Sequence, residues 1–448
     1  MDIRKEMKVE SVKEEKGRIT VITTGARYIL DKSKEKGEIL CYQLLNKERL
    51  IATVGFDHSF STLSVEKKDE NTCVLHQVVG SGGGYTRLQI NSDSLLDVYS
   101  LNELNITIQG NFLPDYSAQK NGHILLIDET GGVGFYPYQG LRNIEFTNFT
   151  SQEWEINYSL DKSFRFLVSV FPPRRFNYAQ SFEERVVHHG CLGHWPPSPL
   201  TNEMIEEARK YANVLVLHDE LIWHGKLTRA GKPRKTVEDL YEDASFCTFD
   251  YVPVDEKDLV RIIKKAHSLG MKVIPYMSPF YSMAKGEDFL EQVKGVLEKY
   301  DFNGIYFDGI STDILYSYKM VRDARKLLGD KILYVHCTVD PLISRNIYCP
   351  FIDTYADYIM RAEGVANASD KYLRYVISGY NISNSIGYVC YYILPVDYMR
   401  KIIDKVLAFN ARFYLGSPET ERERLLKKEY FPKLKKRSKN TKGWRRDD

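Results

Sequence analysis

The stretch FNGIYFDGIS, residues 302–311, decides the fold class of the larger part of the chain. An apolar run, Ile305 to Phe307, is followed directly by the carboxylate Asp308 and then by Gly309. Such a short apolar run is typical of a buried strand, and the glycine indicates where the strand turns into a loop. The next segment, 313–330, has the apolar spacing of an amphipathic helix. The stretch therefore predicts a strand–helix unit with an acid at the end of its strand.

The same strand–helix unit recurs about eight times after residue 180. Strands are expected within 184–195, 213–223, 271–281, 302–311, 331–339, 355–364 and 385–393, with an eighth at the end of 397–416. Helices are expected between them, and one of these, 255–270, begins after the N-cap Asp255 and stops at Gly270. This alternation predicts an α/β TIM (β/α)8 barrel over 181–418. An open doubly wound sheet is the alternative, but no Gly-x-Gly-x-x-Gly follows the first strand.

Residues 1–180 have a different pattern. Short runs such as 18–30 and 104–113 alternate apolar and polar residues, and turn residues separate them at intervals of about ten. This pattern predicts an N-terminal antiparallel β-sandwich. The glycine-rich segment 80–85 lies between two such runs and lacks the Lys-Ser/Thr ending of a phosphate loop, so we interpret it as a hairpin turn. The chain is thus expected to be multidomain.

Charge is distributed unevenly along the chain, whose net charge is +2. Residues 421–448 hold 12 Lys and Arg against 5 Asp and Glu, which leaves 62 − 12 = 50 basic and 60 − 5 = 55 acidic residues elsewhere. The segment 419–448 is therefore a basic C-terminal tail. A basic tail can bind nucleic acid or an anionic surface. We expect a solvated end instead, and no nucleic-acid partner.

Composition indicates a globular protein of the reducing cytoplasm. The seven cysteines are scattered without a Cys-x-x-Cys pair, which favours reduced, buried thiols over a disulfide framework. The charged N-terminus does not read as a signal peptide, and no apolar run approaches the length of a membrane span. We therefore expect a cytoplasmic location and no membrane partner.

Acids stand at the ends of several expected strands. The catalytic side chains of a (β/α)8 barrel lie at the carboxyl ends of its strands. Asp308 ends the fourth strand, and Glu363 ends the sixth, directly before Gly364. Neighbouring strand ends offer further candidates for a site: Asp219, Glu220, Trp223, Tyr276 and His336. Ser311, Thr312 and Asp313 are closer caps for the helix that follows Asp308, which argues against a capping role for that acid.

Paired carboxylates at the mouth of a barrel suit glycoside hydrolysis, in which one acid protonates the leaving oxygen and the other attacks the anomeric carbon or activates water. Arg361 stands two residues before Glu363, so its guanidinium would lower the pKa of Glu363 unless it contacts substrate instead. A metal-dependent barrel hydrolase is the rival reading, although neither His-x-His nor His-Glu-x-x-His is present. No Gly-x-Ser-x-Gly nucleophile signature is present either.

The segments GIYFDGISTDILYSYKMVRDARKLLG and ADYIMRAEG, within 302–364, resemble the retaining α-glycosidases of the melibiase (α-galactosidase) and endo-α-N-acetylgalactosaminidase type. The resemblance implies an N-terminal sandwich followed by a barrel, with Asp308 as nucleophile and Glu363 as general acid/base. Melibiases usually carry a lysine two residues before the nucleophile, where this chain has Tyr306. This departure bears on α-galactoside specificity rather than on glycosidase chemistry.

These observations predict a retaining glycoside hydrolase that cleaves an α-glycosidic bond of an oligosaccharide or glycoside without a cofactor or metal. The catalytic residues would be Asp308 and Glu363. Six residues are predicted to contact the substrate: Asp219, Trp223, Tyr276, Tyr306, His336 and Arg361. A non-catalytic carbohydrate-binding protein on a degenerate barrel is the main alternative.

Overall fold

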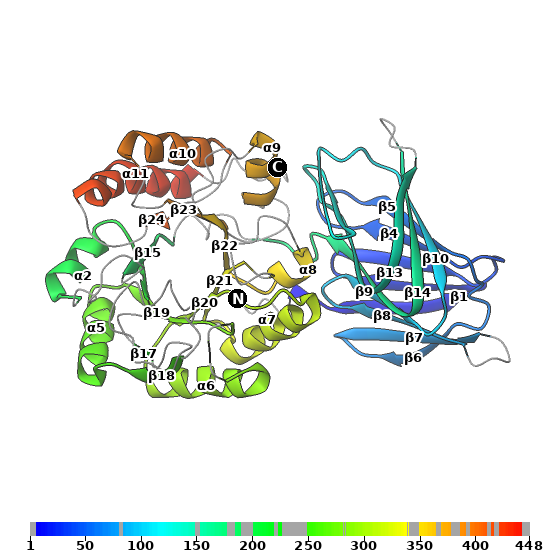
Figure 1. Ribbon diagram of the computed structural model, residues 1–448, viewed down its shortest axis with the longest axis horizontal. Coiled ribbons are helices and arrows are strands. Elements are labelled where there is room, and N and C mark those ends of the chain that lie inside the picture. The colour runs from blue at the N-terminus through cyan, green and yellow to red at the C-terminus, as the bar shows by residue number, and fades with distance from the viewer. Residues whose placement is uncertain are drawn as a thin grey trace. The chain divides into compact units, whose positions relative to one another are not determined.

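The chain divides into two compact units, each with its own core. The computed structural model describes residues 6–79, 84–147, 153–176, 184–189, 200–218, 223–225, 249–280, 282, 284–337, 339, 349–363, 369–377, 386–390, 395–409, 414–415 and 421–440. The first unit comprises Met1–Phe176, Asn346–Thr354 and Tyr380–Ile382, and the second unit the rest of the chain. Both units are labelled by element in Figure 1.

The first unit is built on a 14-stranded sheet whose strand pairs are antiparallel. Its hydrogen-bonded order is β1-β2-β3-β4-β5-β10-β14-β9-β8-β7-β6, and β11, β12 and β13 extend it from β14. The strands are β1 (Val9–Glu15), β2 (Arg18–Thr23), β3 (Ala26–Asp31), β4 (Glu38–Gln43), β5 (Arg49–Phe56), β6 (Ser64–Lys68), β7 (Thr72–Val79), β8 (Gly84–Asn91), β9 (Leu95–Ser100), β10 (Leu104–Gly110), β11 (Tyr116–Lys120), β12 (His123–Ile127), β13 (Gly132–Thr147) and β14 (Trp154–Phe171).

One continuous sheet replaces the two separate sheets that we expected of a sandwich. The 18-residue strand β14 pairs with β10 through Trp154–Leu160 and with β9 through Phe164–Ser169, so the same strand belongs to both halves. Ser163 lies between the two pairings and has a φ of 60°, a left-handed conformation that redirects the strand. The inward side chains of both halves form one apolar core. The helix α8 (Pro350–Asp353) also belongs to this unit.

The second unit is built on a parallel sheet of eight strands in the order β15-β16-β19-β20-β21-β22-β23-β24. The two strands at the ends of this order, β15 and β24, are also in contact. The strands are β15 (Val186–His189), β16 (Val214–Leu217), β19 (Lys272–Met277), β20 (Gly304–Asp308), β21 (Ile332–His336), β22 (Tyr358–Glu363), β23 (Ile386–Cys390) and β24 (Tyr414–Leu415). A separate antiparallel pair consists of β17 (Trp223–Gly225) and β18 (Phe249–Pro253).

Helices surround the strands of the second unit (Figure 1). They are α2 (Asn202–Arg209), α5 (Glu256–Ser268), α6 (Gly286–Lys299), α7 (Ile314–Leu328), α9 (Asp370–Tyr372), the π-helix η2 (Leu373–Ile377), α10 (Val396–Ala408) and α11 (Glu421–Asn440). The predicted cap of α5 is confirmed, because the Asp255 side chain accepts a hydrogen bond from the Asp258 amide. Gly270, with a φ of 70°, follows that helix as expected.

The C-terminal segment departs from our expectation of a solvated tail. Its first part is helix α11, in which four of the described apolar side chains are buried: Leu426, Tyr430, Phe431 and Leu434. They join an apolar cluster with residues of α10 and η2, including Ile403 and Ile377. Their spacing of three and four residues places them on one face of the helix. The many Lys and Arg residues led us to expect a solvated end, so this apolar stripe was not predicted.

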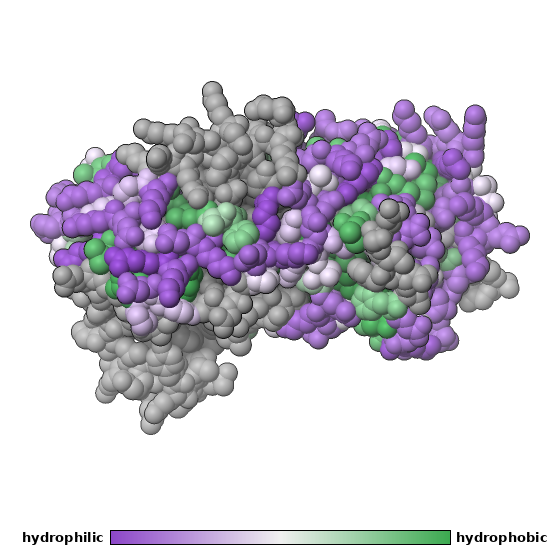
Figure 2. Space-filling model, turned by 90° about the horizontal axis from the view of Figure 1, so that it is seen from above, coloured by the Kyte–Doolittle hydropathy of each residue, from purple (hydrophilic) through white to green (hydrophobic). Residues whose placement is uncertain are grey.

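On the face seen in Figure 2, hydrophobic residues form small separate patches among hydrophilic ones. Within the described ranges, no helix combines the length and the apolarity that crossing a membrane requires. Four cysteines, Cys41, Cys73, Cys337 and Cys349, are buried free thiols, in line with the reduced state predicted for them.

Candidate active site

A row of tyrosines crosses four adjacent strands of the parallel sheet below the candidate site. Tyr276 pairs with Tyr306, Tyr306 with Tyr334, and Tyr334 with Tyr358. All four are buried, and their rings are in contact from one strand to the next. Side chains two residues apart in a strand share a face. The next positions on this face are therefore Ser278, Asp308 and His336, at the carboxyl ends of their strands.

Asp308 receives hydrogen bonds from three side chains. The Nδ1 atom of His336 lies 2.8 Å from Oδ1 of Asp308, and the Tyr306 hydroxyl lies 3.4 Å from the same oxygen. The Tyr276 hydroxyl donates to Oδ2 at 3.0 Å. An ionised carboxylate can only accept, so the Nδ1 atom of His336 carries the proton in this contact. The Asp308 side chain is 22% exposed, which leaves the carboxylate within reach of a ligand.

The surroundings of Asp308 favour its ionised form. Burial by itself raises the pKa of this carboxyl group, but four other effects outweigh it. These are the hydrogen bond from His336, the positive charges of His336 and of His218, and the hydrogen bond from Tyr276. The net result is a pKa below the ordinary value of 3.8. Asp308 is therefore an anion at neutral pH, as a nucleophile has to be.

Two further histidines lie beneath this carboxylate. His188 of β15 is fully buried, and its ring is 5.0 Å from that of Tyr306 and 5.6 Å from that of Tyr334. Burial, together with the nearby His218 and His336, holds the pKa of His188 well below its usual value. His188 is consequently neutral at pH 7. The His218 ring, at the end of β16, is 4.6 Å from that of Tyr276.

Of the predicted substrate contacts, four lie under the site rather than at its surface. Tyr276, Tyr306 and His336 contact Asp308, and they are 1%, 1% and 6% exposed. Trp223 is 2% exposed, and its indole Nε1 donates to the Tyr276 carbonyl oxygen at 2.6 Å. These side chains point inward from the strands or pack against them. In the structure these four side chains hold Asp308 and β19, and their part in binding a sugar stays a prediction.

The other three predicted residues are placed less fully. Glu363 is the last residue of β22 and pairs with Val389 of β23, but its side chain is not among the described ones. Arg361, two residues earlier in the same strand, is buried. Asp219 lies outside the described residues. The pairing of Asp308 with Glu363 in one site therefore stays a prediction.

Several residues that build this site were not predicted from the sequence: Tyr334, Tyr358, His188 and Ser278. A signal for the tyrosines was present, because four consecutive strands each carry a tyrosine and the register places all four side by side. Ser278 donates a short hydrogen bond from its hydroxyl to the Asp308 carbonyl oxygen. No sequence pattern predicts the contact between Ser278 and Asp308.

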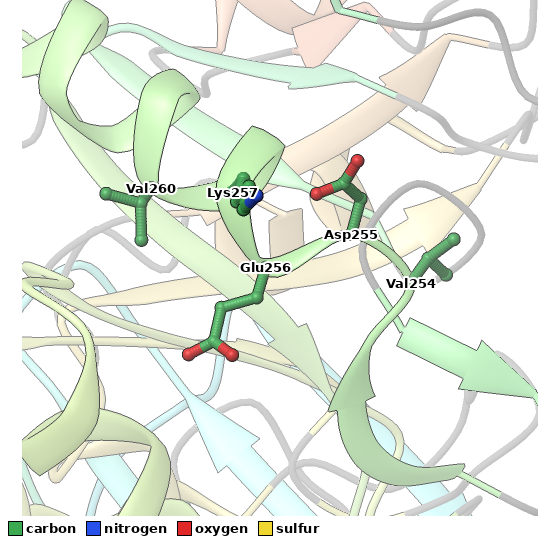
Figure 3. Close-up of a pocket in the computed structure, with 5 residues that line it drawn as sticks. All are labelled: Val254, Asp255, Glu256, Lys257 and Val260. Atoms are coloured by element: carbon green, nitrogen blue, oxygen red, sulfur yellow. The ribbon is translucent and has the colours of Figure 1, made fainter.

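A surface pocket lies elsewhere, at the first turn of α5 (Figure 3). It is lined by Val254, Asp255, Glu256, Lys257 and Val260. Asp255 already caps the helix, and Figure 3 shows the Glu256 side chain pointing away from the Asp255 side chain. This pocket is the exposed beginning of a helix, and Asp308 is not among the residues that line it. Over the described part of the chain, no cluster of three His, Cys, Asp or Glu side chains suited to a metal ion occurs.

Comparison with known proteins finds solved structures that are similar only at low sequence identity. No protein-family model matches the chain, and no curated protein matches its sequence. An uncharacterized protein of Listeria monocytogenes has 9% identity and a TM-score of 0.42, covering 96% of this chain and 54% of that one. The cycloalternan-forming enzyme of the same species, in complex with a pentasaccharide substrate, has 10% identity and a TM-score of 0.42, with 97% and 56% covered.

A glycoside hydrolase family 97 enzyme from Pseudoalteromonas sp. strain K8, in complex with acarbose, has 9% identity and a TM-score of 0.44. That match covers 92% of this chain and 81% of the enzyme. The chain spans about half the length of the two Listeria proteins. At these identities and TM-scores the similar structures carry no assignment, so an assignment of function has to rest on the residues around Asp308.

Proposed function

We propose that this protein is a glycoside hydrolase of the retaining kind that cleaves an α-glycosidic bond. The observation that carries the proposal is the environment of Asp308, an anion at the carboxyl end of β20 that three side chains orient. We also propose that β15 and β24 close the parallel sheet into a (β/α)8 barrel, because these two strands are in contact. The carboxyl ends of all eight strands would then surround one site.

In the proposed reaction Asp308 is the nucleophile. Its Oδ1 atom accepts from both His336 and Tyr306, whereas Oδ2 accepts from Tyr276, so Oδ2 retains a lone pair for attack. Oδ2 bonds to the anomeric carbon as the glycosidic bond breaks, and Glu363 gives its proton to the leaving oxygen. Glu363 then takes a proton from water, whose oxygen bonds to the anomeric carbon and releases Asp308.

The sugar is the finer part of the proposal. The melibiase-like segments favour an α-galactoside, but Tyr306 occupies the position of the usual lysine and donates a hydrogen bond to Asp308 instead. Asp219 and Arg361 remain proposed contacts for sugar hydroxyl groups. A panel of aryl glycosides should therefore include α-glucosides beside α-galactosides, since one similar structure is a dextranase with isomaltotriose.

The experiment that tests the proposal compares two matched substitutions. Asp308→Asn should reduce the hydrolysis of an aryl glycoside at least about a thousandfold, because an amide cannot act as the nucleophile. Asp313→Asn makes the same chemical change five residues away, where Asp313 caps α7. Asparagine caps a helix as well as aspartate, so this variant should keep full activity.

The melting temperature separates a catalytic role from a structural one. We expect both variants to melt close to the wild type. A loss of stability in Asp308→Asn in proportion to its loss of activity would make Asp308 a structural acid. A wild type that hydrolyses no member of the panel would favour a carbohydrate-binding protein instead. Glu363→Gln should slow substrates with poor leaving groups more than activated ones, since only poor leaving groups need the proton.

A further inference from the structure

The antiparallel pair β17–β18 lies outside the parallel sheet and docks onto the carboxyl end of β19. Trp223 of β17 donates its indole N–H to the Tyr276 carbonyl oxygen at 2.6 Å. Tyr251 of β18 brackets Ser278, since its hydroxyl accepts from the Ser278 amide at 2.9 Å and donates to the Ser278 carbonyl oxygen at 3.1 Å. The Trp223 and Tyr251 rings meet edge to face at 5.6 Å.

These two anchored residues of β19 are the ones that contact Asp308. Tyr276 donates to Oδ2 of the carboxylate, and Ser278 donates from its hydroxyl to the Asp308 main-chain oxygen. The end of β19 thus connects the β17–β18 pair with both the side chain and the backbone of Asp308. A shift of Ser278 would change both connections.

Backbone conformation marks the same place. Tyr251 has a φ of 57°, a left-handed conformation that is rare for a bulky residue. In the described part of the second unit, the one other non-glycine residue with positive φ is Cys337, at 55°. Cys337 directly follows His336, which contacts Asp308. Strained residues persist where surrounding contacts over-determine them, and they gather at functional sites. Here both adjoin groups that hold Asp308.

We propose that Tyr251 is a positioning residue for Asp308, acting through Ser278 and the end of β19. Its hydroxyl satisfies both main-chain groups of a residue that is fully buried. Removing that hydroxyl takes this partner away from the buried amide and carbonyl groups of Ser278. We therefore expect the Ser278 backbone to shift. The consequence for turnover rests on the proposed function, whereas the consequence for the Asp308 carboxyl group does not.

The test uses Tyr251→Phe, which keeps the ring packed against Trp223 and deletes only the hydroxyl. Tyr300→Phe is the matched control, because the Tyr300 hydroxyl bonds Glu256 on the outer helices. We expect Tyr251→Phe to lower kcat about tenfold with KM nearly unchanged, as expected of a misaligned nucleophile. Tyr300→Phe should have the kinetics of the wild type.

A second readout needs no substrate. Full-length protein carrying 13C-labelled aspartate carboxyl groups gives an Asp308 resonance that Asp308→Asn identifies by its loss. A weaker hydrogen bond from Tyr276 raises the pKa of Asp308, so its titration midpoint should move upward by roughly half a pH unit in Tyr251→Phe. An unchanged midpoint in folded Tyr251→Phe would overturn the positioning role. If the wild type is inactive but the titration midpoint shifts in Tyr251→Phe, only the glycosidase proposal is contradicted.

Discussion

At the scale of single residues, the chemistry of the site depends on the balance of effects at Asp308. Burial opposes the charge of this carboxylate, while His336, His218 and Tyr276 favour it. The same hydrogen bonds that orient the group therefore also keep it ionised. A carboxyl group whose pKa is lowered in the folded state contributes stability above its unfolded pKa and loses that contribution as the pH falls through the folded pKa.

The contribution of His336 gives a prediction about pH. His336→Ala removes the hydrogen bond and the charge that most lower the pKa of Asp308. The pKa should rise, so the acidic limb of kcat/KM should move to higher pH. His76→Ala, a histidine of β7 in the first unit, is the control and should leave the profile unchanged. If the acidic limb stays in place in His336→Ala, His336 does not influence the pKa of Asp308.

The position of Asp308 at the end of its strand could be predicted from the sequence alone. The apolar run before Asp308 and the glycine after it fix the end of β20, and the structure ends that strand at Asp308. The roles of Trp223 and Tyr276 were not predictable in the same way. Each depends on a partner more than 30 residues away, and such pairing is set by the packing of the sheet rather than by local pattern.

At the scale of elements, the spacing of apolar residues and the helix-capping residues identified the strands and helices of the second unit. The expected ranges for α5 and α7 contain the observed helices, since each has a clear apolar face. The sheet of the first unit was harder to predict, because β14 is long enough to pair with β10 and β9 in succession. Local alternation shows strands, but it does not show which strand joins two halves of a sheet.

Helix α11 gives a prediction at this scale. Leu426 is fully buried, whereas its neighbour Leu425 is 46% exposed. Leu426→Ala should lower the free energy of unfolding by about 2–5 kcal/mol, since it leaves a cavity in the apolar cluster with α10. Leu425→Ala should change it by no more than about 0.5 kcal/mol. Urea unfolding followed by circular dichroism measures both. Equal effects would mean that α11 does not pack as described.

At the scale of the whole molecule, the chain combines an all-β unit with a parallel α/β unit. Every side chain found to hydrogen-bond Asp308 belongs to the second unit. The proposed nucleophile is thus positioned within one unit.

Trapping the covalent intermediate tests the central claim most directly. An activated 2-fluoro glycoside of the preferred sugar should glycosylate the nucleophile of a retaining glycosidase, releasing its leaving group and leaving the glycosyl ester in place. Mass spectrometry of a tryptic digest should then find one added sugar on the peptide 300–319, with fragment ions placing it on Asp308. An ester on another carboxylate, or turnover with inversion and no ester, would contradict the account.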